Sequence, residues 1–332
     1  LICAPAGMEL FVIYLVAGTV AILTFDHFNK GWLQFVTALI VFVVMVCVWM
    51  AFRLVEGMTA ADYHTVLDMA LGALLSVAGY PLIYLFEKIF GFVSVLTLLE
   101  ISSTNTKALR DLSNKAPGTF QHSVQVANIA EDMINEIGGN SLLARVGALY
   151  HDIGKMYAPL YFTENQTSGF NPHAELESED SASVIISHVR NGVEMAKKYH
   201  LPESVIDFIR THHGTTKTGY FYNRYLMEHP GEPVDEALFA YNGPKPYSRE
   251  TAVVMLVDSV EAAVRSLKNH DKESISDLID RIVEGKIRDN QFSNCNITFR
   301  DIDTIKRILK DKMLSIYHVR IAYPVVDASK RK

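Results

Sequence analysis

The hydrophobic residues of this chain are concentrated in its first part. Three stretches, 10–25, 32–52 and 69–86, contain no charged residue, and the second has Trp32 and Trp49 near its ends, where membrane helices carry aromatic residues. A helix rises about 1.5 Å per residue, so about 20 apolar residues cross a hydrocarbon core of roughly 30 Å. The pattern predicts a membrane region over residues 1–90, with about three transmembrane helices and the lipid bilayer as a partner.

The remainder of the chain has the composition of a soluble domain, and its apolar residues recur at helical spacing. No alternating pattern typical of strands has useful length, so the predicted fold class is all-α, with transmembrane helices followed by a helical domain. We expect a linker helix within 91–117, the helical domain over 118–325 and a tail over 326–332. Residues 158–177 and 219–248 contain Pro and Gly and are expected to be loops, the second long enough for a lid or a binding wall. Helices are expected at 119–137, 142–150, 178–199, 249–267, 274–284 and 299–317.

The basic residues after the third apolar stretch include Lys88, Lys107, Arg110 and Lys115. They favour a cytoplasmic location for the helical domain, because loops rich in Lys and Arg stay on the inner side of a membrane. We therefore expect a multi-pass protein of the inner or plasma membrane. The chain begins at Leu1 without a basic region or a small-residue cleavage site, and we expect it to be the C-terminal part of a longer membrane protein.

The overall charge argues against a nucleic-acid-binding protein, and the cysteines argue against a disulfide-stabilised or Cys-x-x-Cys zinc protein. A net charge of −6 gives no broad positive potential, so DNA or RNA polymers are not expected as partners. The three cysteines are scattered and form neither a disulfide framework nor a Cys-x-x-Cys zinc motif. This pattern is typical of a domain in a reducing compartment.

Candidate chemistry first appears at the sequence Leu149-Tyr150-His151-Asp152-Ile153-Gly154-Lys155. The adjacent His151 and Asp152 offer a nitrogen and a two-oxygen ligand at one point, which is the beginning of a metal site. Gly154 would allow a sharp backbone turn, and Lys155 would reach a phosphate from there. The dipeptide alone is a weak motif, because His-Asp pairs also occur by chance.

Asp258 strengthens the case for a metal. It interrupts an apolar helix pattern, and an ionised carboxylate in such surroundings must find a cation or shift its pKa strongly. A metal ion is one such cation, and Arg265 or Arg190 are alternatives that remain open. His188 also stands in an apolar sequence, where a polar ring needs a partner.

Five histidines and two aspartates fall on separate predicted helices, which makes coincidence the weaker explanation. Seven nitrogen and oxygen ligands without a cysteine exceed what one ion needs, so two metal ions that share a carboxylate are the natural number. The other histidines are expected to be structural or exposed, and His173 remains an open candidate for the pocket wall. The seven candidate ligands are His122, His151, Asp152, His188, His212, His213 and Asp258.

The order H…HD…H…HH…D of these residues resembles the HD-domain metal-dependent phosphohydrolases. It is most similar to one branch, the seven-transmembrane-HD (PgpH-type) cyclic di-AMP phosphodiesterases of bacteria, over residues 88–325. The motifs that carry the resemblance are Ala116-Pro117-Gly118-Thr119-Phe120-Gln121-His122-Ser123, His151-Asp152-Ile153-Gly154-Lys155, Glu164-Asn165-Gln166, Asn171-Pro172-His173, His212-His213-Gly214-Thr215, Tyr220-Phe221-Tyr222, Gly243-Pro244-Lys245-Pro246 and Met255-Leu256-Val257-Asp258-Ser259-Val260-Glu261-Ala262.

The resemblance implies an enzyme that hydrolyses cyclic di-AMP to the linear dinucleotide pApA, with a hydroxide between two iron or manganese ions as the nucleophile. One ion would be bound by His122, His151 and Asp258, the other by His188, His212 and His213. Asp152 would bridge both ions as a catalytic residue, and Lys155 would be catalytic by binding a substrate phosphate. The resemblance also implies a cytoplasmic HD domain and a larger extracellular domain before the membrane helices.

Three other functions remain open from the sequence, one of them a broad nucleotidase. A cyclic di-GMP phosphodiesterase of the HD-GYP type would have an acidic residue after its paired histidines and a Gly-Tyr-Pro tripeptide, whereas Gly214 and Thr215 follow here. A membrane receptor would use the domain to bind a nucleotide without cleaving it. The sequence leaves the metal identity, base selectivity, the sensed signal and a homo-oligomeric state open.

Overall fold

The structure is a computed structural model that describes residues 7–25, 34–55, 63–166 and 171–317. The predicted tail, 326–332, and Trp32 lie outside these described residues. The chain divides into two compact units, Leu1–Glu100 and Ile101–Lys332. Among the described residues of both units, regular structure is helical and no strand forms, which confirms the predicted all-α fold class.

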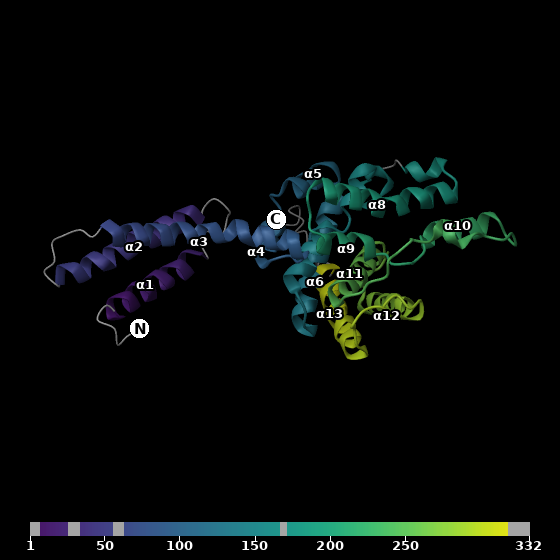
Figure 1. The fold of residues 1–332 in the computed structure, drawn as a ribbon. Coiled ribbons are helices and arrows are strands. Elements are labelled where there is room, and N and C mark those ends of the chain that lie inside the picture. Colours follow the sequence, from purple (N-terminus) through teal and green to yellow (C-terminus); the bar gives the residue numbers. More distant parts are fainter. Residues whose placement is uncertain (1–6, 26–33, 56–62, 167–170, 318–332) are drawn as a thin grey trace, which may run out of the picture. The chain divides into compact units, whose positions relative to one another are not determined.

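The first unit consists mainly of α1 (Gly7–Phe25), α2 (Gln34–Val55) and α3 (Tyr63–Phe90) (Figure 1). Two helical segments, Gly7–Thr24 and Phe35–Val55, are long and apolar enough to cross a membrane. Few of their residues are buried, so most of their apolar surface is available to lipid. They coincide with two of the predicted spans and indicate membrane anchoring.

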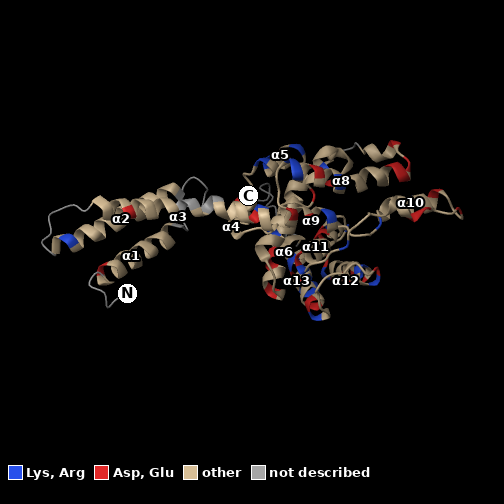
Figure 2. Ribbon diagram, viewed as in Figure 1, with Lys and Arg blue, Asp and Glu red and all other residues tan. Residues whose placement is uncertain are grey.

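The third predicted span, 69–86, lies inside α3. Within α3 the structure provides a shorter apolar helical segment, Tyr63–Leu75, which does not reach the length of a span. The third span therefore remains a prediction. Figure 2 shows few Lys, Arg, Asp or Glu residues on α1 and α2, whereas charged residues are spread over the helices of the second unit.

The described residues of the second unit form helices of 8 to 21 residues and five short 3₁₀ segments. Helix α4 (Val95–Ser102) contains the boundary between the units. The predicted linker region holds this helix and α5, and Pro117 begins α6. The elements are α5 (Lys107–Lys115), α6 (Pro117–Ile137), α7 (Ser141–Tyr150), η2 (Ile153–Tyr157), η3 (Pro159–Tyr161), η4 (Thr163–Asn165), η5 (Pro172–Glu175), α8 (Ser178–Lys198), α9 (Glu203–Thr211), α10 (Gly219–Glu228), η6 (Glu236–Phe239), α11 (Arg249–Arg265), α12 (Lys272–Arg288) and α13 (Phe299–Tyr317).

Helix α11 is the centre of this unit and packs against α6, α7, α9, α12 and α13 (Figure 1). Its residues from Thr251 to Asp258 are all buried, because the helix is apolar on nearly every side. A capping box fixes its first turn, in which the Ser248 side chain accepts from the backbone of Thr251. Glu250, also in this turn, accepts the backbone N–H of Asn140, the residue that caps α7, at 2.8 Å. The starts of α7 and α11 are thereby joined.

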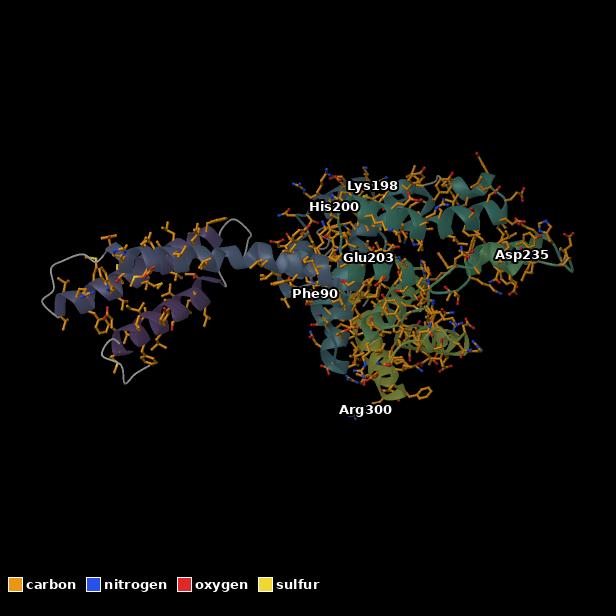
Figure 3. All side chains as sticks on the ribbon, in the orientation of Figure 1. Phe90, Lys198, His200, Glu203, Asp235 and Arg300 are labelled. Atoms are coloured by element: carbon orange, nitrogen blue, oxygen red, sulfur yellow. The ribbon has the colours of Figure 1, made fainter. Side chains whose placement is uncertain are left out.

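The stretch 219–248, expected to be a loop, is partly helical: it contains α10 and η6. Apolar contacts stabilise α10, since its Phe221 packs together with Phe239 of η6 and Ala182 of α8. Phe221 and Phe239 therefore belong to a small core, whereas Ala240 and Tyr241, later in the same stretch, line a cavity. The labels Lys198 and His200 in Figure 3 mark the turn that joins α8 to α9.

Candidate metal centre

His151 and Asp152 stand where α7 ends and η2 begins. Helix α7 is held by Tyr150, which is fully buried and donates its hydroxyl to the carbonyl of Ile101 at 2.8 Å. His151 follows the last residue of α7 and keeps helical dihedral angles, φ −53° and ψ −35°, whereas the backbone of Asp152 departs from them with φ −105° and ψ 13°. Both side chains are at most 1% exposed. A buried helix therefore delivers the His-Asp pair into the interior.

Gly154 allows η2 to pack directly on α8. A Cβ at this position would lie 1.9 Å from the carbonyl oxygen of His188 and 2.5 Å from the backbone nitrogen of Gly192. The sharp turn expected at Gly154 is not its role, because its φ lies outside the left-handed region that favours glycine. The close approach instead brings Asp152 to within 3.3 Å of His188, measured from Oδ1 to Nε2.

Four of the predicted ligands form a first ligand group, His122, His151, Asp152 and Asp258, whose ligand atoms all lie within 4.8 Å of one another. His122 Nε2 is 2.9 Å from Asp258 Oδ1 and 3.7 Å from Asp152 Oδ2. His151 Nε2 is 3.4 Å and 3.3 Å from the same two oxygens. The residues come from α6, the end of α7 and α11, so the group forms only in the folded domain.

The other three predicted ligands, His188, His212 and His213, form a second ligand group. His188 lies on α8, while His212 and His213 follow the last residue of α9. The Nε2 atoms of His188 and His212 are 3.1 Å apart, and Asp152 Oδ1 lies 3.3 Å from the first and 3.6 Å from the second. The two oxygens of Asp152 therefore face different ligand groups. The structure thus brings all seven predicted ligands together.

The unsatisfied atoms of the centre are those that a metal would bind. Within the described residues, His151 Nε2 and Asp152 Oδ1 are buried and have no hydrogen-bond partner. A buried polar atom without a partner costs on the order of 1–3 kcal/mol, and coordination of a cation removes that cost. The donor set of imidazole nitrogens and carboxylate oxygens is suited to a divalent ion.

Both buried aspartates of the centre are ionised. Burial disfavours the charged form of Asp152, but the charges of Lys155 and His151 more than offset it and hold the pKa of this carboxyl well below its usual range. Burial likewise opposes ionisation of Asp258, but a hydrogen bond from His122 and the charge of His151 lower its pKa well below the usual value. Ionised carboxylates are the form that binds a metal.

His151 differs electrostatically from His212 and His213. Burial opposes a charge on His151, but Asp152 and Asp258 favour it and raise its pKa to about 10. His212 and His213 lie farther from the carboxylates, and burial lowers the pKa of both rings, which are therefore neutral at pH 7. Neutral imidazole is the metal ligand, so an ion entering the first ligand group would displace a proton from His151.

Lys155 is a buried lysine and not a surface one. Its side chain is 13% exposed, and Nζ lies 2.7 Å from Asp152 Oδ2 and 2.9 Å from Glu164 Oε1. Burial opposes its charge, but Asp152 and Glu164 raise the pKa of Lys155 well above the usual value. Glu164 also accepts the hydroxyl of Thr119, from the first turn of α6, at 3.0 Å. Sequence reasoning assigned Glu164 no role, because its partners Lys155 and Thr119 precede it by 9 and 45 residues and no periodic pattern connects the three.

A cavity of about 470 Å³ adjoins the second ligand group. Its wall includes His213 and Tyr241, whose rings stack with centroids 4.2 Å apart, together with Arg190 of α8. Tyr241 was not singled out from the sequence. It follows η6, and its backbone N–H donates a 2.8 Å hydrogen bond to the carbonyl of Thr216. This bond holds Tyr241 beside the paired histidines.

The fold and the centre together define a class of protein, an all-helical metal-binding domain whose two ligand groups share one aspartate. Residues 119–263 match the HD domain, and the chain belongs to this HD-domain family, in the branch of the cyclic-di-AMP phosphodiesterase PgpH. The chain is 38% identical to PgpH of Bacillus subtilis over 324 residues, which are 96% of this chain and 45% of that protein. It is also 38% identical to PgpH of Listeria monocytogenes over 327 residues, 97% of this chain and 45% of the relative. The chain thus spans about half the length of these curated relatives.

Solved structures agree with this assignment. The crystal structure of the L. monocytogenes PgpH HD domain has a TM-score of 0.61 and 44% sequence identity with this chain, and the similarity covers 64% of this chain and 100% of that domain. The crystal structure of the same domain in complex with cyclic-di-AMP has a TM-score of 0.61 and 45% identity, covering 65% of this chain and 99% of that one.

Proposed function

We propose that this chain is the membrane-anchored part of a metal-dependent phosphodiesterase that hydrolyses cyclic di-AMP to the linear dinucleotide pApA. The observation that carries the proposal is the orientation of Asp152, whose Oδ2 faces the first ligand group and whose Oδ1 faces the second. The identity of the relatives, which are cyclic-di-AMP phosphodiesterases, and the cyclic-di-AMP complex of the related HD domain support the choice of substrate.

The centre would hold two divalent ions. His122, His151 and Asp258 would bind one, His188, His212 and His213 the other, and Asp152 would bridge them. Imidazole with carboxylate suits iron and manganese, which we propose as the metals. When bound, such a pair supplies an activated water molecule and positive charge that stabilises the oxygens of a phosphoryl group under attack.

The protein's own residues would orient the substrate. Lys155, held in place by Glu164, presents a fixed positive charge beside the centre, and we propose that it binds a phosphate oxygen of the substrate. The cavity next to His213 and Tyr241 would take a further part of the dinucleotide, with Arg190 as a cation at its wall. Thr119 and Glu164 would keep Lys155 from turning toward solvent.

The location we propose is the inner or plasma membrane, with several spans and the HD domain on the cytoplasmic side. The apolar helices α1 and α2 and the basic residues after α3 support this orientation. We also propose that residues 1–90 form the membrane region, 91–117 the linker and 118–325 the HD domain.

The test is turnover by the purified chain in detergent. The chain is loaded with Mn²⁺ or Fe²⁺ and incubated with cyclic di-AMP or cyclic di-GMP, and the linear products are separated by chromatography. We expect cleavage of cyclic di-AMP in clear preference to cyclic di-GMP. The opposite preference would contradict the substrate assignment, and tight binding without turnover would favour the receptor function.

A further inference from the structure

Glu261 is a buried carboxylate on α11 that does not face the space between the two ligand groups. It follows Asp258 by three residues, so both side chains lie on the same face of the helix. Its exposure is 0%, and its Oε2 accepts a hydrogen bond from Nδ1 of His122. Its other oxygen, Oε1, accepts from Arg265 at 2.5 Å and from the hydroxyl of Tyr317 at 2.9 Å.

The partner of Nδ1 distinguishes His122 from three other ligand histidines. The Nδ1 atoms of His151, His188 and His212 lie 2.7, 2.6 and 2.9 Å from backbone carbonyl oxygens. These acceptors are neutral, whereas the acceptor for His122 is a carboxylate. The guanidinium of Arg265 lies 2.5 Å from the other oxygen of Glu261, and this ion pair favours the ionised form of the carboxylate.

A charged acceptor behind a metal-binding histidine has two effects. It fixes the tautomer in which Nδ1 carries the proton and Nε2 is free for the metal, and it increases the basicity of Nε2. His122 Nε2 points at the space bounded by Asp258 Oδ1 and Asp152 Oδ2, at 2.9 Å and 3.7 Å. Glu261 therefore orients His122 and strengthens its Nε2 as a ligand of the first group.

Among the residues that the structure describes, no carboxylate stands behind a histidine of the second ligand group in the way that Glu261 stands behind His122. The second group consists of three histidines, and the described structure places one shared carboxylate, Asp152, against His188 and His212. His213 reaches a carboxylate oxygen, Asp258 Oδ2, only at 3.9 Å. The two groups thus differ in charge although they share a bridge.

We propose that Glu261 is a positioning residue that makes the first ligand group bind its divalent ion more tightly than the second. The inference rests on the proposed two-metal function. Helix α13 would then contribute indirectly to metal binding, because the hydroxyl of Tyr317, the last described residue of that helix, donates a hydrogen bond to Glu261. Loss of an outer partner of a metal-binding histidine typically weakens metal binding about 10- to 100-fold.

The experiment is a titration of the metal-stripped full chain in detergent with Mn²⁺, in which isothermal titration calorimetry measures the binding of the metal. For Glu261→Gln we expect two bound ions per chain, with the Kd of the tighter one raised about 10- to 100-fold and that of the weaker one changed less than about twofold. His213→Ala removes a ligand of the second group alone. In that background we expect one bound ion, whose Kd still rises when Glu261→Gln is added.

The matched control is Asp280→Asn. Asp280 of α12 also accepts from basic residues of α13, Lys306 at 2.9 Å and Lys310 at 2.6 Å, but it has no contact with either ligand group. We expect both Mn²⁺ constants of this variant to equal those of the wild type. Tyr317→Phe keeps the carboxylate and removes one of its donors, so it tests the same point if Glu261→Gln does not fold, with an expected severalfold rise of the tighter Kd.

Three results decide between the claims. Unchanged constants in Glu261→Gln, or in Tyr317→Phe when the first variant does not fold, would overturn the role of Glu261. An equal weakening of both ions would also overturn it, because the effect would then not be confined to the first ligand group. A wild-type chain that binds fewer than two ions would instead contradict the proposed two-metal function.

Discussion

Replacement of Gly154 by alanine is the sharpest test of how the centre is assembled. The added Cβ would lie 1.9 Å from the carbonyl oxygen of His188 and 2.5 Å from the nitrogen of Gly192, whereas ordinary contact begins near 3.4 Å. Both obstacles are backbone atoms, so no side-chain rotation can relieve the overlap. The segments η2 and α8 must therefore separate by about 1.5 Å.

This separation acts directly on the bridge between the ligand groups. Asp152 precedes Gly154 by two residues, and its Oδ1 lies 3.3 Å from Nε2 of His188. Metal sites tolerate changes in ligand distance of about 0.2 Å, and a misplacement of about 1 Å costs on the order of 100-fold in rate. For Gly154→Ala we expect about one metal ion fewer per chain, turnover reduced at least 100-fold and a loss of about 3 kcal/mol in the free energy of unfolding.

The control for this variant is Gly285→Ala. Gly285 lies within α12, and the nearest atom to an added Cβ is the end of the Arg288 side chain at 4.0 Å. Alanine is favoured over glycine in a helix by about 1 kcal/mol, so this variant should be more stable and fully active. Metal content is measured by mass spectrometry, stability by denaturant unfolding and turnover by product chromatography. A Gly154→Ala chain with two ions and wild-type turnover would refute the reasoning.

Three further predictions follow from the described contacts. Asp152→Ala should abolish metal uptake and turnover together, and a metal-loaded, active variant would show that Asp152 is not the bridge. Burial opposes ionisation of Glu164, but the charge of Lys155 lowers the pKa of this carboxyl below its ordinary value of 4.5. The ionised carboxylate therefore stabilises the fold at pH values above 4.5, and this stabilisation is lost as the pH falls through the lowered pKa. In metal-free chain, Glu164→Gln should therefore lower the free energy of unfolding by about 2 kcal/mol at pH 7 and by little at the acidic end, and a pH-independent difference would contradict this. The whole chain should remain with membranes after alkaline extraction because of α1 and α2, and recovery in the soluble fraction would count against anchoring.

The fold class and the ligand set could be predicted because each has a local signal. The apolar residues recur at helical spacing and do not alternate with polar ones, which excluded a sheet. The long stretches without charged residues predicted the helices α1 and α2. Asp258 stood out because a carboxylate inside an apolar helix demands a cation. The third span was harder, since α3 contains Gly and Pro and its apolar character is less continuous.

Features made by contacts distant in sequence had no such signal. The role of Gly154 depends on α8, which follows after a long loop, so the sequence suggested a turn where the structure has a close approach. The helix α10 was not predicted because the Pro and Gly residues of 219–248 suggested a loop and its packing partner, Phe239, comes later in the chain. Lys155 was expected to face a phosphate, and the structure adds the two carboxylates that hold it.

Glu261 shows where the sequence signal existed and was masked. It is a carboxylate in the same apolar helix as Asp258, so the same physical reasoning applies to it. Arg265, however, lies four residues later on the same helix face and offers a sufficient local partner. The structure shows that Arg265 takes one oxygen of Glu261 and leaves the other for His122. A carboxylate has two oxygens, and a local ion pair that satisfies one of them does not exclude a second role for the other, as the two orientations of Asp152 also show.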